Sequence, residues 1–446
     1  MSQPPAIPAP PSLASARFPD EILFVLRTLR RAGYAAYLVG GSIRDRLLGK
    51  EAKDHDVATS ARAEVVAKLF RRVIPTGIKH GTVTVLIGDS AIEVTTFRGE
   101  GEYRDGRRPD SVFFIEDIVE DLARRDFTIN AMAFDPETKT LIDPFGGGED
   151  LARRLVRCVR DPLKRFSEDG LRPLRAVRFA SVLDFEIETA TREAIPKTIE
   201  TFAKVAQERV REELTRLLVG GHPARGVALL RETGLLARIL PEVAALDGIE
   251  EQGRDAFELT LARVDRAPVE LELRLAALLH DIELGPAPAK LPKRLSRVEA
   301  VLDRLRYPLK VIEQVDLLVK HRGFALSRYA DDAELRRGLA AVGRNLVAPL
   351  IALGRCQASA LGDEALLRGI DELEQRVAEV LAKNPALAPG ELAIDGRRIM
   401  DLLGLPRGPQ VGHAMRYLME RVLDDPDLNT AESLERLLKG WFTSQA

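Results

Sequence analysis

YLVGGSIRDRLLG at residues 37–49, followed by KDHDVAT at 53–59, is the stretch that determines the fold of the head of this chain. The apolar run that ends at Val39 predicts a buried strand, and the glycine pair 40–41 predicts a tight turn before a short helix. Backbone N–H groups at such a turn can bind phosphate oxygens, and Arg44 adds a positive charge there. No GxxxxGK[ST] follows, so this is not a P-loop, and a glycine pair alone equally predicts an ordinary turn.

Two carboxylates follow this turn at Asp54 and Asp56. In a strand, residues i and i+2 point to the same face, so both carboxylates converge while His55 points away. Carboxylate oxygens are ligands that Mg²⁺ prefers. An Asp-x-Asp pattern is common on solvated loops, but its position shortly after GGSIRD favours a metal site.

Outward from this stretch, the chain divides into a mixed head and a helical remainder. Short segments rich in Val, Ile, Phe and Thr predict strands at 36–39, 82–87, 92–97, 112–115 and 132–135. Helical patterns lie at 19–32, 43–48, 63–71 and 118–125. After about residue 150 the pattern is almost wholly helical, as at 210–218 and 271–279. The fold class is therefore α+β, with a long α region after the head.

Composition excludes several classes of protein. With 446 residues, 66 Lys+Arg against 68 Asp+Glu and 45% apolar residues, the chain can bury several cores. Two cysteines are too few for a disulfide framework. No segment reaches the ~18 apolar residues that a membrane span needs, and the apolar run 346–353 contains Pro349, which favours a buried helix. We therefore expect a cytoplasmic protein with no membrane partner; the sequence makes no prediction of its oligomeric state.

Five sequence motifs, which follow one another along the chain, resemble those of a known family. After GGSIRDRLLG and DHD come RRDFTINAMA at 124–133, DPFGGGEDL at 143–151, EDGLRPLRAVRFA at 168–180 and ERVREEL at 208–214. This series resembles the bacterial class II tRNA nucleotidyltransferases and the related bacterial poly(A) polymerases. The resemblance implies a polymerase-beta-like nucleotidyltransferase head with a mixed or antiparallel sheet, followed by an elongated all-α neck, body and tail.

Five regions follow from this comparison and from clusters of Pro and Gly. They are a disordered Pro-rich extension (1–18), the catalytic head (19–150), a helical neck that recognises the nucleotide base (151–220), a helical body with a degenerate HD domain (221–360) and a helical tRNA-binding tail (361–446). In the tail, GLPRGP at 404–409 predicts a turn between two helices.

The resemblance also implies a set of site residues. Asp54 and Asp56 correspond to the catalytic, metal-binding pair, with Mg²⁺ as the expected cofactor. The implied nucleotide-binding residues are Gly41, Arg44, Arg125, Asp169, Arg172, Arg175 and Arg178. The residues that contact tRNA are left open. Glu93, on the predicted strand IEVTTF, is equally consistent with a third carboxylate of the site and with a surface residue of an edge strand.

The neck motif supplies charges suited to a triphosphate and a base. Arg172, Arg175 and Arg178 are spaced i, i+3, i+6 on one helical face, which suits phosphates or an RNA backbone but also describes an exposed salt-bridged face. Asp169 and Arg172 are three apart on the predicted helix and can be neighbours. In the resembled family this pair reads the base: a carboxylate accepts from the amino group of C or A, and a guanidinium donates to the ring nitrogen.

Smaller signals separate the activities within the family. TGIKHGTVTV at 76–85 is typical of the tRNA enzymes, and TFRGEGEYRDGRRPDSV at 96–112 resembles the flexible loop used to add the terminal A. We therefore expect addition of CCA to the 3′ end of tRNA from CTP and ATP. The alternatives are an A-adding or CC-adding enzyme, a poly(A) polymerase, or a catalytically silent tRNA-binding protein.

His280 and Asp281, within LRLAALLHDI at 273–282, form the centre of an HD phosphohydrolase motif. A metal site there needs further His and Asp ligands. Leu259 occupies the place of the expected upstream His, and 283–292 offers no downstream His. We therefore expect a retained helical framework in which His280 is satisfied by hydrogen bonds.

Charge is segregated along the chain although the net charge is −2. The window 153–178 has nine basic residues against three acidic ones, and 290–322 has nine against four. If the fold gathers these windows on one face, a tRNA backbone can lie there, and binding will weaken as salt rises.

Overall fold

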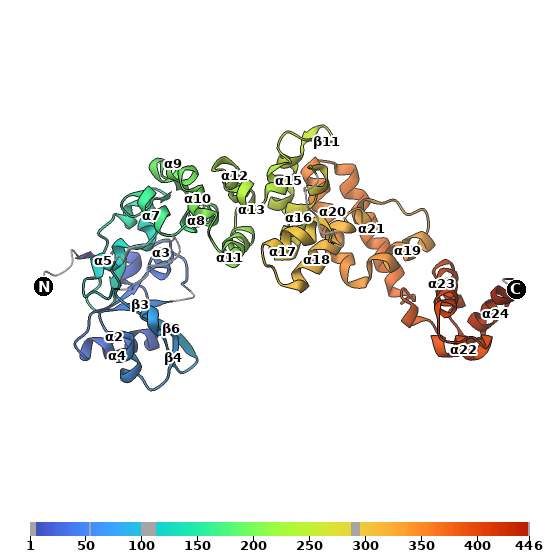
Figure 1. Ribbon diagram of the computed structural model, residues 1–446, viewed down its shortest axis with the longest axis horizontal. Helices are drawn as coiled ribbons and strands as arrows, with labels where there is room; N and C mark the ends of the chain where they lie inside the picture. The colour runs from blue at the N-terminus through green and yellow to red at the C-terminus, as the bar shows by residue number, and fades with distance from the viewer. Residues whose placement is uncertain (1–5, 53–54, 100–112, 287–294, 445–446) are drawn as a thin grey trace. The chain divides into compact units, whose positions relative to one another are not determined.

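The structure, a computed structural model, describes residues 6–52, 55–99, 113–286 and 295–444. The chain forms two compact units, Met1–Ala244 and Ala245–Ala446. Unit 1 holds the sheet and the first part of the helical region, and unit 2 is almost entirely helical (Figure 1). The finer boundaries at 150, 220 and 360 remain predictions.

The sheet of unit 1 is mixed, as the sequence predicts. Its strand order among the described residues is β1-β8-β7-β2-β3-β6-β5-β4. Neighbouring strands are antiparallel except β3 and β6, which are parallel. The strands are β1 (Ala6–Pro8), β2 (Ala36–Val39), β3 (Asp56–Thr59), β4 (Val73–Gly77), β5 (Thr82–Ile87), β6 (Ser90–Thr96), β7 (Ala133–Asp135) and β8 (Thr140–Ile142).

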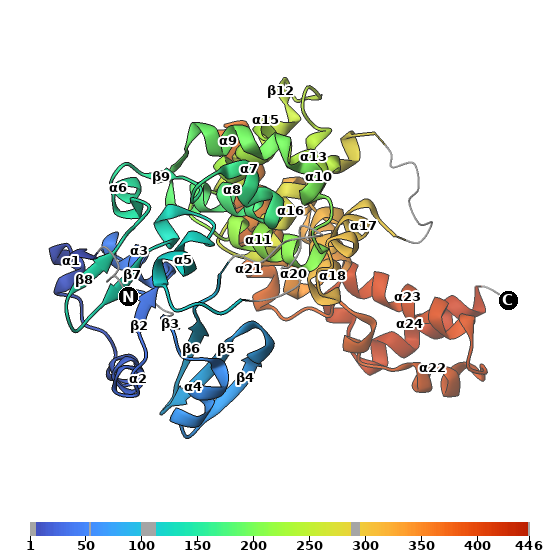
Figure 2. The same ribbon diagram turned by 60° about the vertical axis from the view of Figure 1, so that its left-hand side comes forward.

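The helices of the head lie close to their predicted places. They are α2 (Asp20–Arg31), α3 (Gly41–Leu47), α4 (Ala63–Leu69) and α5 (Ile118–Ala123). Helix α4 lies against β5 and β6 (Figure 2). Helix α5 begins at its cap Asp117, whose side chain accepts a hydrogen bond from the Val119 N–H.

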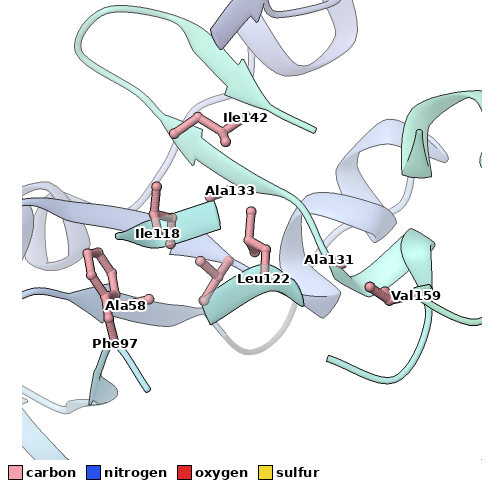
Figure 3. Close-up of a cluster of buried hydrophobic side chains, with 9 residues drawn as sticks. Ala58, Phe97, Ile118, Leu122, Ala131, Ala133, Ile142 and Val159 are labelled. Atoms are coloured by element: carbon pink, nitrogen blue, oxygen red, sulfur yellow. The ribbon is translucent and has the colours of Figure 1, made fainter. Parts of the chain in front are cut away.

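A buried apolar cluster holds α5 on the sheet. Ile118 and Leu122 of α5 pack with Ala58 and Phe97, which lie on β3 and directly after β6 (Figure 3). Leu122 and Phe97 are fully buried. Burying a side chain of this size stabilises the fold by about 1.5–3 kcal/mol. The cluster therefore fixes α5 and the arginines that follow it beside the ends of β2, β3 and β6.

Two predictions for the head are wrong. Residues 6–18 are not a disordered extension: β1 pairs with β8, and Leu13 of the short helix α1 (Pro11–Ala14) is fully buried. An edge strand tolerates proline because one side of it needs no ladder hydrogen bonds. The predicted strand at 112–115 is reduced to an isolated bridge between Arg98 and Phe114, and residue 112 lies outside the described residues.

Helices make up most of the rest of unit 1, together with a short parallel pair of strands, β9 (Leu155–Val156) and β10 (Glu186–Ile187). The helices are α6 (Gly147–Ala152), α7 (Pro162–Glu168), α8 (Arg172–Leu183), α9 (Thr189–Lys197), α10 (Ile199–Phe202), α11 (Gln207–Leu218), α12 (Pro223–Glu232), α13 (Leu236–Ile239) and α14 (Pro241–Ala244). Helix α8 contacts both α11 and α12. Its first two turns carry the arginine row of the neck motif.

Unit 2 is built around the long helix α20 (Arg344–Leu361), which contacts α15 (Ala256–Arg266), α16 (Leu271–Leu279) and α21 (Glu364–Ala382). The remaining helices are α17 (Arg297–Arg304), α18 (Leu309–Lys320), α19 (Asp332–Val342), α22 (Gly396–Leu403), α23 (Pro409–Asp424) and α24 (Ala431–Thr443). The apolar run with Pro349 lies in α20, where Val347, Leu350 and Ile351 are buried, as predicted. The predicted turn at 404–409 joins α22 to α23.

No single helix of the described chain is long and apolar enough to cross a membrane. Helices α19 and α20 pass such a test only when taken together, and they are bent by 102° where they meet.

Candidate nucleotide-binding site

A cavity of about 560 Å³ lies in unit 1 where the glycine turn, the sheet and α8 meet. Its lining combines eight arginines with four acidic residues. The arginines are Arg44, Arg98, Arg124, Arg125, Arg172, Arg175, Arg178 and Arg216, and the acidic residues are Asp56, Glu93, Asp126 and Asp169. This excess of fixed positive charge suits a polyanionic ligand such as a nucleoside triphosphate.

The glycine turn forms one wall of the cavity. Gly40 has φ +75°, a conformation that favours glycine, and it caps α3. A Cβ at Gly40 would lie 3.0 Å from Nη1 of Arg125 and 3.6 Å from Oδ2 of Asp56. The turn therefore leaves room for a guanidinium and a carboxylate beside the backbone, and Gly41 begins α3 directly after it.

Asp56 and Glu93 bring two carboxylates to the same wall. In the parallel pair of β3 and β6, Asp56 is in register with Glu93, and both line the cavity. The interpretation of Glu93 as an edge-strand residue is wrong, because β6 lies between β3 and β5. Asp54 lies outside the described residues. Carboxylate oxygens beside a cavity are donors that fit a divalent metal ion.

Arg44 and Arg125 converge on Asn130. Nη1 of Arg44 donates to Oδ1 of Asn130 at 2.7 Å, and its Nε donates to Asp45 at 2.9 Å. Nη1 of Arg125 lies 3.4 Å from the backbone oxygen of Asn130, and its Nη2 lies 3.5 Å from Oδ2 of Asp121. The structure thus brings two of the predicted triphosphate contacts together beside the glycine turn.

The arginine row of α8 is held by buried carboxylates. Nε of Arg175 donates to Asp126 at 2.8 Å, and its Nη1 lies 3.2 Å from Glu213. Glu213 also accepts from Arg178, so this side of α8 is not the exposed salt-bridged face that the spacing allowed. The guanidiniums of Arg44, Arg175 and Arg178 lie 5.2, 5.5 and 3.9 Å from the ring centre of Phe179.

These contacts set the charge states at the floor of the cavity. Burial alone would raise the pKa of Asp126, but Arg175 and a hydrogen bond from Asn130 lower it to about 2. Burial opposes the charge of Arg175, yet Asp126 and Glu213 raise its pKa above its ordinary value. Asp126 is therefore a carboxylate and Arg175 a cation at neutral pH, and the ion pair between them is in place before any ligand binds.

Asp169 and Arg172 both line the cavity, but they do not share a helix as predicted. Asp169 lies in extended backbone after α7, and Arg172 begins α8. The carboxylate of Asp169 accepts two hydrogen bonds from Arg209, at 3.1 and 2.8 Å. Arg172 donates to Oε2 of Glu168 at 2.8 Å and to the backbone oxygens of two other residues. Each member of the pair is thus oriented by its own partner.

Several lining residues were not singled out from the sequence. Asp126 and Asn130 lie within RRDFTINAMA, and Phe179 lies within the neck motif, so the motifs themselves carried the signal. Arg98 follows β6, and burial lowers its pKa to about 10. Arg216 follows ERVREEL by two residues. No spacing rule indicated either of these two arginines.

Similarity to known proteins covers almost the whole chain. Residues 36–157 match the family described as "Poly A polymerase head domain", and 184–246 match "Probable RNA and SrmB- binding site of polymerase A". A CCA-adding enzyme of Lactobacillus helveticus is 36% identical over 93% of this chain and 95% of its own length. The chain belongs to the CCA-adding enzyme family. A second member, from Geobacillus stearothermophilus, is 36% identical over 93% of this chain and 95% of its own length.

Solved structures of this family have the same fold. The Bacillus stearothermophilus CCA-adding enzyme in complex with CTP matches with a TM-score of 0.75 and 31% identity, over 98% of this chain and 99% of that one. The Thermotoga maritima CCA-adding enzyme complexed with tRNA matches with a TM-score of 0.63 at 19% identity, over 99% and 100% of the two chains, which bears on the fold alone. The predicted family and fold class are thereby confirmed.

Proposed function

We propose that this protein adds CCA to the 3′ end of tRNA, using CTP and ATP, in tRNA maturation and repair. The observation that carries this proposal is the pairing of Asp56 and Glu93 beside a cavity lined by eight arginines. Membership of the CCA-adding family over nearly the full length supplies the substrates. A tRNA-processing role is expected in the cytoplasm.

The acidic wall of the cavity is proposed to hold a magnesium ion. Asp54 and Asp56 would be its ligands, with Glu93 as a third carboxylate next to them. When bound, the ion lowers the pKa of the tRNA 3′-hydroxyl and neutralises charge on the triphosphate. The protein's own part is to place Asp56, at the start of β3, beside Glu93 of the paired strand β6, in the same cavity as the arginines.

The cationic side binds and orients the triphosphate. Arg44 and Arg125 flank the glycine turn, and Arg175 and Arg178 project from α8 over Phe179. Because their carboxylate partners fix these side chains beforehand, little rotamer freedom is lost when phosphate binds. The α-phosphorus is thereby held where the 3′-hydroxyl of tRNA can attack it and release pyrophosphate.

Asp169 and Arg172 are proposed to select C and A. Both bases present an amino donor beside a ring-nitrogen acceptor, which matches a carboxylate beside a guanidinium. Uracil and guanine present a carbonyl beside an N–H, and both protein groups would then be mispaired. An unpaired buried polar group costs ~1–3 kcal/mol, which is enough for useful rejection.

Supplying nucleotides one at a time to tRNA that ends at its discriminator base tests this function. We expect incorporation of two CMP residues from CTP alone, and a single AMP once ATP is added. An A-adding enzyme would ignore CTP, and a CC-adding enzyme would stop before AMP. A poly(A) polymerase would extend from ATP alone, and a silent tRNA-binding protein would incorporate nothing.

A further inference from the structure

The HD pair of unit 2 is closed inside the protein and has no part in the proposed transfer reaction. His280 ends α16, and Asp281 precedes the short helix η3 (Ile282–Leu284). Both side chains are buried. Nδ1 of His280 lies 2.6 Å from Oδ1 of Asp281, so His280 is satisfied by a hydrogen bond, as predicted from the sequence.

A third buried group, the guanidinium of Arg263 on α15, meets this pair. Arg263 is fully buried. Its Nη2 forms an ion pair with Oδ2 of Asp281 and donates to Oγ1 of Thr260 at 3.0 Å. Its Nη1 donates to Oε1 of Gln357 at 2.7 Å and lies 3.1 Å from Nδ1 of His280. Four polar side chains, from α15, α20 and the C-terminal end of α16, therefore surround one planar cation.

This arrangement does not fit a metal ion. A bound metal needs lone pairs that converge on one point, but His280 and Asp281 share a proton with each other and face a positive guanidinium. Among the described residues, no group of three or more His, Cys, Asp and Glu side chains could hold a metal. With Arg263 in place, the HD pair therefore lacks the converging lone pairs that a metallophosphohydrolase needs.

The charges at this cluster are balanced by the protein itself. Burial lowers the pKa of His280 to about 4, so its ring is neutral. Burial opposes the charge of Asp281, but its hydrogen bond with His280 and the charge of Arg263 hold its pKa well below its usual value, so it is a carboxylate. Arg322 and Glu251 also face the cluster. The charge of Asp281 is thus compensated by Arg263, as a metal ion would compensate it in an open HD site.

We propose that the guanidinium of Arg263 is the resident cation of this HD pair: it occupies the place of a divalent metal, ties α15 to α16 and α20, and keeps the body metal-free. Two consequences follow. Replacing Arg263 by a small neutral side chain opens a cavity whose lining can bind a divalent ion. Removing the positive charge alone leaves a buried carboxylate without its partner, which is strongly destabilising.

Manganese binding to the full-length chain tests the first consequence. The double variant Asp54→Ala and Asp56→Ala serves as the background, because it removes the proposed metal ligands of the head. We expect this background to bind no Mn²⁺ in unit 2 by electron paramagnetic resonance. Adding Arg263→Ala should create one Mn²⁺ site per chain, and further adding Asp281→Asn should abolish it, whereas Arg263→Lys should create none.

Two results would overturn the proposal. One is Mn²⁺ binding by the background chain that disappears with Asp281→Asn, since the HD pair would then be a working metal site. The other is a folded Arg263→Ala chain, verified by circular dichroism, that binds no Mn²⁺.

Thermal unfolding keeps the proposal testable if the alanine variant does not fold. Arg263→Met should lower the melting temperature by several degrees, and adding Asp281→Asn should recover part of that loss because the unpaired charge is removed. In the same head background, EDTA should leave the melting temperature unchanged. A double variant less stable than Arg263→Met, or a fall in melting temperature with EDTA, would contradict the assignment of Arg263 as the cation.

Discussion

Arginines are buried in both units, but their roles differ. In unit 1, eight arginines and four carboxylates line a cavity of about 560 Å³, so positive charge is left over and is accessible to a ligand. In unit 2, Arg263 is enclosed by Asp281, Gln357 and Thr260, and its charge is matched inside the cluster. The comparison teaches that arginines indicate a ligand site where their positive charge remains unbalanced at a cavity, and have a structural role where neighbouring carboxylates balance that charge.

The largest effect is expected from the carboxylates of the cavity in unit 1. Replacing Asp54 and Asp56 by alanine should reduce incorporation of CMP and AMP by at least about 10³-fold, because the proposed metal ligands and the charge neutralisation they would provide are lost. The measurement is single-turnover incorporation on a defined tRNA. Asp89→Ala, in the exposed turn between β5 and β6, is the matched control and should be neutral.

Retention of wild-type rates in a folded Asp54→Ala and Asp56→Ala chain would remove the metal assignment. It would also remove the distinction between a catalytic cluster in unit 1 and a structural cluster in unit 2.

Glu93 is expected to have the next largest effect. Glu93→Gln keeps the size of the side chain but removes one charge beside Asp56, so activity should fall by about 10–100-fold and the magnesium concentration for half-maximal rate should rise. Glu64→Gln, on the exposed face of α4, provides the control. An unchanged rate and an unchanged magnesium requirement would return Glu93 to a surface role.

The buried Asp126 should stabilise unit 1 in a pH-dependent way. Its pKa is lowered from 3.8 to about 2, so its contribution is present above pH 3.8 and is lost as the pH falls towards 2. The pH-dependent part is about 2 kcal/mol. The stability difference between wild type and Asp126→Asn, measured by urea unfolding, should therefore shrink by about that amount between pH 5 and pH 2.

A stability difference between these two chains that stays constant over that pH range would show that Asp126 is not held as a carboxylate by Arg175. In that case the arginine row would lack its charged anchor.

The smallest expected effect is on base selection. Asp169→Ala removes the acceptor for the amino group of C and A, while Arg172 stays bound to Glu168 and keeps its donors. We expect the ratio of kcat/KM for CTP over UTP to fall by about 5–30-fold, corresponding to ~1–2 kcal/mol. The ratio is its own control, because a general loss of activity would lower both values equally. A fall in both values with an unchanged ratio would assign Asp169 a purely structural role.

Local patterns in the sequence predicted much of the fold. The strands at 36–39 and 82–87 and the helices of the head follow from apolar periodicity and turn residues, and the structure has them within a few residues. Weak local signals failed at the edges of the sheet. The proline-rich start forms β1 because β8 offers a free edge, which composition cannot reveal.

The residues of the site were harder to predict from the sequence, because they come from segments that are far apart along the chain. Glu93 meets Asp56 through a parallel strand pairing that no local pattern specifies. The break between α7 and α8 was missed because its cause is tertiary. A Cβ at Gly170 would lie 2.5 Å from the backbone oxygen of Thr201, so only glycine fits where this break passes the Thr201 backbone. No sequence motif includes Arg263, and only its burial beside the HD pair in the structure indicated its role.

The central claim is that unit 1 selects C and A from a mixture without a nucleic-acid template. Its most direct test is to incubate the full-length chain with all four nucleoside triphosphates and tRNA that ends at its discriminator base, and then to sequence the products. We predict products that end in CCA and no longer tails. Products that carry U or G, long runs of A, or no added nucleotide would contradict the account.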